Sequence, residues 1–236
     1  MSVNYDHTKS PHTIQGASAA LSYVLPNVRP ASVLDVGCGI GTWLRAAAEM
    51  DVADIRGVDG VALSSNKLLF SYEYFSVVDL SKPFNLNSRY DLVLCLEVAE
   101  HLDAAASGIL IASLIEHGKT ILFSAACPNQ PGQSHLNCQW PEYWQKLFNQ
   151  HGYACDDSIR WRMWNDTRIE PWYRQNIFIA VYNPDCAGTE ARIMPVVHPD
   201  MIPVMAGLSR YFPQALARLI RLSRFSAGSL LKRKSP

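Results

Sequence analysis

The stretch VLDVGCGIGTWL, residues 33–44, joins an apolar run to three glycines at alternate positions. Short apolar runs of this kind are typical of buried strands, and the pattern from Thr42 onward is typical of a helix. Glycines at the junction let the backbone turn sharply and pass close to a bound molecule, because no Cβ stands in the way. The stretch therefore predicts a strand, a tight turn and a helix whose free N–H groups face a ligand.

The rest of the chain repeats this alternation of short apolar runs with longer helical patterns. Strands joined by helices pair in parallel, with helices on both faces of the sheet. No helix is expected between the last two strands, which predicts that they are antiparallel neighbours. The sequence thus predicts a doubly wound, mostly parallel α/β fold. The expected strands cover residues 32–36, 54–58, 74–78, 90–96, 119–126, 153–160 and 176–182, and the expected helices cover residues 10–25, 42–50, 103–116 and 141–151.

The composition changes near the end of this core, at about Asn183, which predicts a domain over residues 1–183 and an extension over residues 184–236. No acidic residue follows Asp200, whereas seven lysines and arginines do. Residues 212–224 have the pattern of a basic amphipathic helix. Three roles stay open for it: docking on its own domain or on a sister subunit in a homodimer, weak contact with an anionic membrane surface, or a flexible solubilising end.

Overall composition, 48% hydrophobic and 18% charged, is typical of a soluble globular protein. The first eleven residues lack the basic start and apolar stretch of a secretion signal, which predicts a cytoplasmic protein. The six cysteines show no tight spacing, so reduced thiols are expected. Cys127, His135 and Cys138 resemble part of a zinc site, but the Cys-x-x-Cys pairing of structural zinc is absent and no metal is expected.

Acidic residues follow three of the expected strands and indicate what the turn binds. The Gly-x-Gly-x-Gly spacing fits neither the dinucleotide fingerprint nor a Walker loop. Asp59 is placed to accept hydrogen bonds from both hydroxyls of a ribose, and Asp79 from an adenine amino group. Asp35 adds negative charge where a ligand ammonium would be stabilised. The pattern therefore favours a nucleoside that carries a positively charged amino acid.

Four motifs resemble those of the class I S-adenosylmethionine-dependent methyltransferases: VLDVGCGIG at residues 33–41, VDG at 58–60, VVDLS at 77–81 and YDLVLCLEVAEHL at 90–102. The resemblance implies a Rossmann-like seven-stranded sheet with an antiparallel last strand and S-adenosylmethionine as cofactor. It places the glycine turn beside the methionine portion, the N–H of Leu80 at the adenine ring and Glu97 near the sulfonium. The implied cofactor-binding residues are Asp35, Gly37, Cys38, Gly39, Gly41, Asp59, Gly60, Asp79, Leu80 and Glu97.

Methyl transfer to a hydroxyl needs a base, and two histidines lie near the expected mouth of the site. His135 is the first candidate, because it belongs to the long loop of residues 127–140, which follows the fifth expected strand. Long loops of this kind are often functional. His101 is the second candidate and follows the fourth strand. The alternative for His135 is a loop histidine that only makes a local hydrogen bond. The alternative for His101 is a residue at a helix start that holds the loop in place.

The loop and the later aromatic cluster also resemble bacterial methyltransferases of glycan and secondary-metabolite pathways. This predicts a small-molecule or saccharide acceptor, although the aromatic residues could equally cover the sheet edge. The signature of DNA-amino methyltransferases is absent and the body is acidic, which argues against nucleic acid. A non-catalytic cofactor-binding partner and a protein or RNA methyltransferase remain alternatives. The expected acceptor-binding residues are Asn137, Trp140, Tyr143, Trp172, Tyr173, Arg174 and Asn176.

Overall fold

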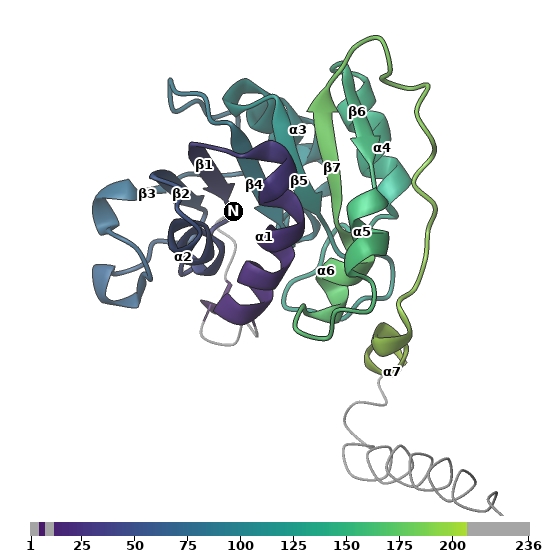
Figure 1. Ribbon diagram of the computed structural model, residues 1–236, viewed down its shortest axis with the longest axis horizontal. Coiled ribbons are helices and arrows are strands. Elements are labelled where there is room, and N and C mark those ends of the chain that lie inside the picture. The colour runs from purple at the N-terminus through teal and green to yellow at the C-terminus, as the bar shows by residue number, and fades with distance from the viewer. Residues whose placement is uncertain (1–4, 8–11, 207–236) are drawn as a thin grey trace, which may run out of the picture. The chain divides into compact units, whose positions relative to one another are not determined.

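The computed structural model describes residues 5–7 and 12–206 and contains one seven-stranded sheet (Figure 1). Its strand order is β3-β2-β1-β4-β5-β7-β6. All neighbouring strands are parallel except β7, which is antiparallel to both β5 and β6. The predicted fold class, including the antiparallel last strand, is confirmed. The strands are β1 Ser32–Val36, β2 Asp54–Asp59, β3 Phe75–Val77, β4 Leu92–Leu96, β5 Thr120–Ser124, β6 Tyr153–Asp156 and β7 Phe178–Tyr182.

Within residues 1–198, helices flank the sheet and short 3-10 turns lie in several connections. The helices are α1 Ile14–Val28, α2 Thr42–Glu49, α3 Ser107–His117, α4 Pro141–Asn149, α5 Ser158–Met163, α6 Pro171–Asn176 and α7 Ile202–Met205. The 3-10 turns cover Ser65–Lys67, Tyr72–Tyr74, Ala99–His101, Ala104–Ala106 and Pro199–Met201.

Both faces of the central strands are buried, and neighbouring residues of one strand enter different cores. Val33 of β1 packs in a core that includes α1 and α2 residues, whereas Leu34 packs in a second core that includes α3 and α4 residues. In β4, Leu92 and Val93 divide in the same way. Successive side chains of a strand point to opposite faces, so continuous apolar runs are what a sheet covered on both sides requires.

Two expectations for the region between β6 and β7 are wrong. The sixth strand ends at Asp156 rather than at residue 160, because the Asp156 carboxylate accepts hydrogen bonds from the N–H and hydroxyl of Ser158 and the chain enters α5 there. The insert also contains α6, which begins at Pro171. Neither helix has more than six residues, too few for the helical period to stand out in the sequence.

The first helix also differs from its prediction, since it begins at Ile14 and ends at Val28 with Pro26 inside its last turn. The Thr13 hydroxyl accepts a hydrogen bond from the N–H of Gly16 and caps the helix, and Thr13 in turn donates to Glu170 from its N–H and hydroxyl. These bonds attach the start of α1 to the region just before α6.

Residues 1–198 and residues 199–236 form two compact units. Within the first unit, the segment after β7 is attached through Glu190, whose carboxylate accepts hydrogen bonds from Gln145, Asn149 and the N–H of Cys155. The amphipathic pattern at residues 212–224 lies outside the described residues. Among the described residues, no helix combines the length and apolarity that a bilayer crossing requires.

Candidate active site

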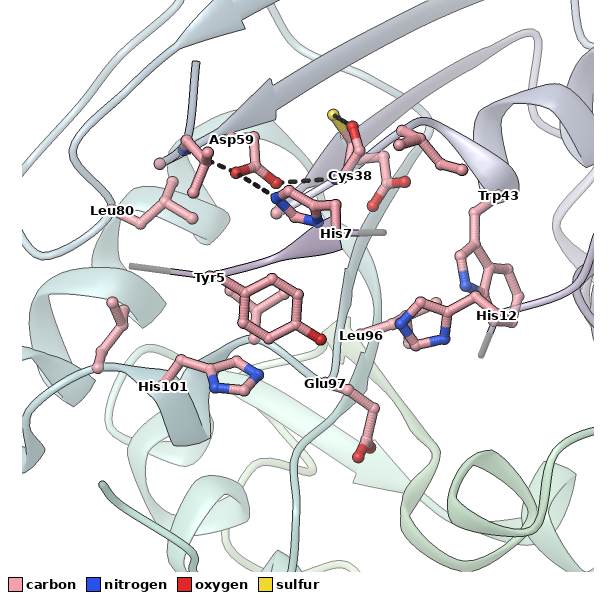
Figure 2. Close-up of a pocket in the computed structure, with 18 of the residues that line it drawn as sticks. Tyr5, His7, His12, Cys38, Trp43, Asp59, Leu80, Leu96, Glu97 and His101 are labelled. Carbon is pink, nitrogen blue, oxygen red and sulfur yellow. Dashed lines mark hydrogen bonds and ion pairs between the residues drawn. The ribbon is translucent and has the colours of Figure 1, made fainter. Parts of the chain in front are cut away.

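A pocket of about 430 Å³ opens at the carboxyl ends of β1, β2 and β4 (Figure 2). This is the edge at which ligands bind in open α/β sheets. The pocket brings together most of the residues predicted to contact a cofactor, together with one predicted base and one predicted acceptor residue. These lining residues are Asp35, Gly37, Cys38, Gly39, Asp59, Gly60, Asp79, Leu80, Glu97, His101 and Tyr173.

The glycine turn has the backbone conformation expected for it, with φ angles of 80°, 52° and 87° at Gly37, Gly39 and Gly41. Residues other than glycine rarely adopt these angles. The turn is held against β2, because the N–H groups of Gly37 and Cys38 both donate to the Val58 carbonyl. Gly41 does not line the pocket, and a Cβ there would lie 2.2 Å from the Phe70 ring. Its contact is therefore with the apolar packing of the turn.

Asp59, the last residue of β2, lies at the centre of the pocket and is 4% exposed. Its two carboxylate oxygens accept hydrogen bonds of 2.8 Å from the N–H groups of Gly39 and Val61. These bonds hold the carboxylate in one orientation, and each oxygen keeps capacity for another donor. The side chain is thus prepared to accept hydrogen bonds from a ligand.

Asp35 lies deeper, in β1, and is 2% exposed. Burial, with the charge of Asp59 added, raises the pKa of Asp35 to about 8. Its Oδ2 atom has no hydrogen-bond partner among the described residues. A buried carboxyl with an unmet oxygen on a pocket wall fits a cationic ligand group, which would supply both charge and donors.

Asp79 and Leu80 lie at the rim. The Asp79 carboxylate accepts hydrogen bonds from the N–H and hydroxyl of Ser81 and pairs with Lys82 at 3.0 Å. These partners, the Ser81 hydroxyl first, lower the pKa of Asp79 to about 2. Leu80 is buried and, with the half-exposed Val77, gives this end of the pocket an apolar surface suited to a flat ring.

We call Tyr5–His7 the N-terminal segment, and its Tyr5 and His7 side chains line the same pocket, which no pattern in the sequence predicted (Figure 2). The Nε2 atom of His7 is 3.4 Å from an Asp59 carboxylate oxygen. Its ring also fills the space that the missing side chain of Gly39 leaves, because a Cβ on Gly39 would lie 2.9 Å from His7. The Tyr5 ring lies between the rings of His7 and His101, 4.9 Å from each.

Glu97 follows β4 and has a φ of 55°, an unusual angle for a residue with a side chain. One carboxylate oxygen accepts a hydrogen bond of 2.8 Å from Gln130 Nε2, and the other accepts one of 3.2 Å from Asn176 Nδ2. Burial raises the pKa of Glu97, and the bonds from Asn176, Ser124 and Gln130 oppose that shift.

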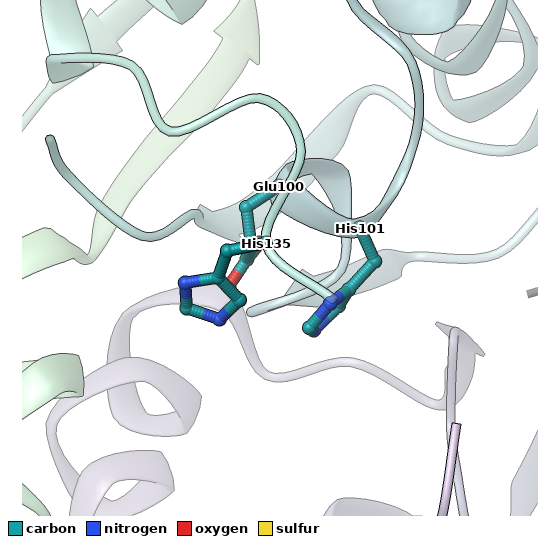
Figure 3. A group of neighbouring side chains, drawn as sticks. All are labelled: Glu100, His101 and His135. Atoms are coloured by element: carbon teal, nitrogen blue, oxygen red, sulfur yellow. The ribbon is translucent and has the colours of Figure 1, made fainter. Parts of the chain in front are cut away.

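Glu100, His101 and His135 form a cluster beside Glu97, in which one ligand atom from each lies within 4.8 Å of the others (Figure 3). Glu100 is fully buried in the 3-10 turn, and neither carboxylate oxygen has a hydrogen bond of ordinary geometry within the described residues. Burial and the charge of Glu97 raise the pKa of Glu100, although backbone N–H groups of Glu100 and Ala126 oppose the shift. The raised pKa favours the neutral carboxyl of Glu100 in the free protein, and a cation bound beside it would favour the carboxylate.

The two histidines of this cluster present neutral rings. Burial, with the nearby His135, lowers the pKa of His101 to about 4, and its Nδ1 atom has no partner among the described residues. Burial also lowers the pKa of His135. The Nδ1 atom of His135 lies 2.9 Å from the Gln130 carbonyl and therefore donates to it, which leaves the other nitrogen as an acceptor. Neutral imidazoles beside a carboxylate are common metal ligands.

The residues expected to bind an acceptor separate into two groups. Tyr173 lines the pocket, where its hydroxyl contacts Trp43 Nε1 at 3.2 Å and His12 Nδ1 at 2.8 Å, and Asn176 reaches Glu97. Trp172 packs near His12. Asn176 and Trp172 are not among the residues that line the pocket. The remaining four do not line it either: Asn137 bonds to Ser107, Arg174 bonds to Trp164 and His198, Tyr143 packs on Trp144, and Trp140 precedes α4.

Comparison with known proteins agrees with this arrangement. A family model described as a methyltransferase domain matches residues 11–173. The ubiquinone biosynthesis O-methyltransferase of Neisseria meningitidis serogroup C is 30% identical over 121 residues, which are 47% of this chain and 50% of that protein. Its serogroup A counterpart is 30% identical over 115 residues, 44% of this chain and 48% of that protein. The chain spans about half the length of these curated relatives.

Two solved structures share the fold. The plantazolicin methyltransferase BpumL has a TM-score of 0.53 and 17% identity, with 76% of this chain and 88% of that chain covered. The methyltransferase domain of a bacterial CtHen1 has a TM-score of 0.51 and 18% identity, with 72% and 98% covered. The family match extends over more than half of the chain and includes the glycine turn and the acidic strand ends. The chain therefore belongs to the class I S-adenosylmethionine-dependent methyltransferases.

Proposed function

We propose that the protein transfers a methyl group to a hydroxyl of a small molecule or saccharide that is held at a divalent cation bound by Glu100, His101 and His135. The observation that supports this most strongly is the state of Glu100, a fully buried carboxylate without an ordinary hydrogen bond beside two neutral histidines. This departs from the expectation of no metal, which considered His135 with Cys127 and Cys138 rather than with Glu100 and His101. Cys138 Sγ does lie 3.6 Å from His135 Nδ1, but the candidate ligand set contains neither cysteine.

The pocket fits S-adenosylmethionine, which supplies an electrophilic methyl group on a sulfonium. In this proposal, Asp59 binds the ribose hydroxyls, because its carboxylate is already oriented by two backbone N–H groups. Asp35 faces the ammonium of the methionine portion, which would meet its unpaired oxygen. The apolar rim at Leu80 takes the adenine ring, with Asp79 at its edge.

A divalent cation lowers the pKa of a bound hydroxyl, which makes the oxygen nucleophilic near neutral pH. Glu100, His101 and His135 would hold the cation, and the hydroxyl proton would pass to solvent. Glu97 and the cluster would position the oxygen so that the O–C bond forms in line as the S–C bond breaks and the neutral thioether leaves, a step whose rate depends mainly on alignment. His135 and His101, predicted as alternative bases, act together as ligands in this scheme. The printed function of the Neisseria relatives, O-methylation, is consistent with a hydroxyl acceptor.

The proposal is tested with purified protein from which metals have been removed by a chelator. Turnover is followed as release of demethylated cofactor, with a panel of phenolic and saccharide acceptors and with Mg²⁺, Mn²⁺ or Zn²⁺ added back. We expect activity to require one of these cations and to fall by about 100-fold or more in Glu100→Gln, while cofactor affinity changes little.

The matched control is Glu142→Gln, which removes an exposed carboxylate that pairs with Lys146 and Arg192 outside the site. Full activity after chelation, or in Glu100→Gln, would contradict the cation role. Cofactor binding without turnover of any acceptor, in the presence of each metal, would favour the non-catalytic alternative.

A further inference from the structure

Gln130 connects groups on three separate parts of the site. Its Nε2 donates to Glu97 at 2.8 Å, and its Oε1 accepts from Asn176 Nδ2 at 2.9 Å. Its backbone carbonyl accepts from His135 Nδ1 at 2.9 Å. One residue thus contacts the carboxylate after β4, an amide of α6 and the imidazole of the loop. The side chain is 8% exposed, so these bonds are shielded from water.

The bonds to Glu97 are arranged to hold one carboxylate orientation. Gln130 donates to one oxygen of Glu97, and Asn176 donates to the other. The two amides also bond to each other, which fixes which end of Gln130 carries its donors. The backbone at Glu97 has a positive φ, and its carboxyl group meets Ser124 and Glu100 as well as these two amides.

The bond to His135 sets the tautomer of that ring. A carbonyl cannot donate, so Nδ1 carries the proton and the second nitrogen holds the lone pair. Metal-ligating histidines commonly have such a partner, which fixes the ring and its tautomer. The same residue therefore orients an acidic and an imidazole group that face one site.

We propose that Gln130 is a positioning residue for the methyl-transfer site, with its side chain orienting Glu97 and its carbonyl orienting His135. This rests on the cation-assisted function proposed above. Substitution of such a partner commonly lowers metal affinity or activity by about 10-fold to 100-fold. A residue that only filled the loop would instead affect stability.

The test compares Gln130→Leu and Gln130→Glu with the control Gln145→Leu. The leucine removes both polar groups of Gln130 at similar volume, and the glutamate keeps an acceptor for Asn176 but sets a second carboxylate against Glu97. Gln145 is a buried amide of α4 that bonds to Glu190 and the Ala191 carbonyl, away from the pocket. Thermal unfolding, Mn²⁺ titration and steady-state kinetics are measured for each protein.

Both Gln130 variants keep the backbone carbonyl that orients His135, so we expect them to act through Glu97: kcat should fall by about 10-fold or more with little change in the KM for cofactor, and any change in Mn²⁺ affinity should be smaller, because the three proposed ligands are unchanged. The control should lose stability while keeping both kcat and Mn²⁺ affinity. In a Glu97→Gln background, Gln130→Leu should have a much smaller effect on kcat, since both substitutions act through the same carboxylate.

Two failures are distinguishable. If the unsubstituted protein neither binds Mn²⁺ nor needs a cation, the proposed function is wrong. If it does bind and use Mn²⁺, but Gln130→Leu changes only stability as Gln145→Leu does, the proposed function stands and the positioning role of Gln130 is wrong. An unchanged effect of Gln130→Leu in the Glu97→Gln background would also overturn it.

Discussion

The pocket has two sides that differ in how their polar groups are satisfied. On the side of β1 and β2, Asp59 is held by backbone N–H groups only two and twenty residues away in sequence. On the side of β4 and the loop, Glu97 is held by side chains from residue 130 and residue 176, and Glu100 has no ordinary hydrogen bond. The first side thus holds its central carboxylate by backbone bonds at strand ends, and the second holds its carboxylate by side chains from distant segments. Each side also has a buried carboxyl oxygen without a partner among the described residues, on Asp35 and on Glu100.

The difference is consistent with the division of roles proposed for the two sides. A side that recognises a ligand of constant structure can be built from turns at strand ends, where backbone donors are always present. A side that activates an acceptor requires carboxylates and imidazoles brought together from distant segments, and burial keeps them reactive. If this view is correct, substitutions on the two sides should separate cofactor binding from turnover.

The largest effect on cofactor binding is expected for Asp59→Ala. The change removes an oriented carboxylate from two ribose hydroxyls, and each hydrogen bond to a charged group contributes about 1.5 to 3 kcal/mol. The affinity for S-adenosylhomocysteine, measured by calorimetry, should therefore fall by about 100-fold or more. Mn²⁺ affinity should not change. Equal losses of both affinities would show that the two sides are not separable. Retained nucleoside binding in a folded variant would show that Asp59 does not bind the ribose.

A smaller effect of opposite sign is expected for His7→Ala. The His7 ring lies 3.4 Å from an Asp59 oxygen for which a ribose hydroxyl would compete, so removing the ring should strengthen cofactor binding by a few-fold. The Kd for S-adenosylhomocysteine reports this directly. A weaker affinity would mean that His7 stays in place and assists the ligand.

The smallest expected effect is the release of a proton from Asp35 when the cofactor binds. The pKa of Asp35 is raised to about 8, so near pH 7 the free protein holds a proton that an incoming ammonium would expel. Binding should therefore release up to about one proton, and affinity should rise as the pH approaches 8. Calorimetry in buffers of different ionisation enthalpy measures the release, which Asp35→Asn should abolish. Uptake of protons, or no dependence on the buffer, would refute this assignment.

The same shift has a consequence for folding whose sign is fixed. The folded pKa of about 8 lies above the ordinary value of 3.8 for an aspartate, so between these values the native state keeps a proton that the unfolded state has lost. The contribution of Asp35 to stability is thus present below about pH 4 and lost as the pH rises towards 8. Denaturant titrations of the ligand-free protein and of Asp35→Asn test this trend.

The ligand side was largely predictable, since it depends on local signals. Alternate glycines after an apolar run indicated a turn at a strand end, and Asp59 and Asp79 followed two further strands. Because parallel strands end at one edge, residues far apart in the chain could be placed in one pocket by topology alone. Gly41 shows the limit of this reasoning, because only the structure reveals that the Phe70 ring, and not the pocket, lies beside its Cα atom.

The acceptor side was less predictable, because its contacts join distant segments. His101 and His135 stood out by residue type, but Glu100 did not, and its full burial follows from the 3-10 turn and the loop above it. The pairing of Gln130 with Asn176 depends on where α6 begins, and that helix was not expected. No pattern in the sequence indicated that Tyr5–His7 lie in the pocket.

The N-terminal segment contacts both sides at once, which bears on the order of events in catalysis. His7 lies against Asp59, Tyr5 against His101, and Asp6 exchanges two hydrogen bonds with Gln133 of the loop. A nucleoside that displaces His7 from Asp59 would therefore also weaken the contacts of Tyr5 with His101 and of Asp6 with Gln133. Binding of the methyl donor would then displace the N-terminal segment and open access to the acceptor side. The enzyme should therefore bind its substrates in a fixed order, with the methyl donor first.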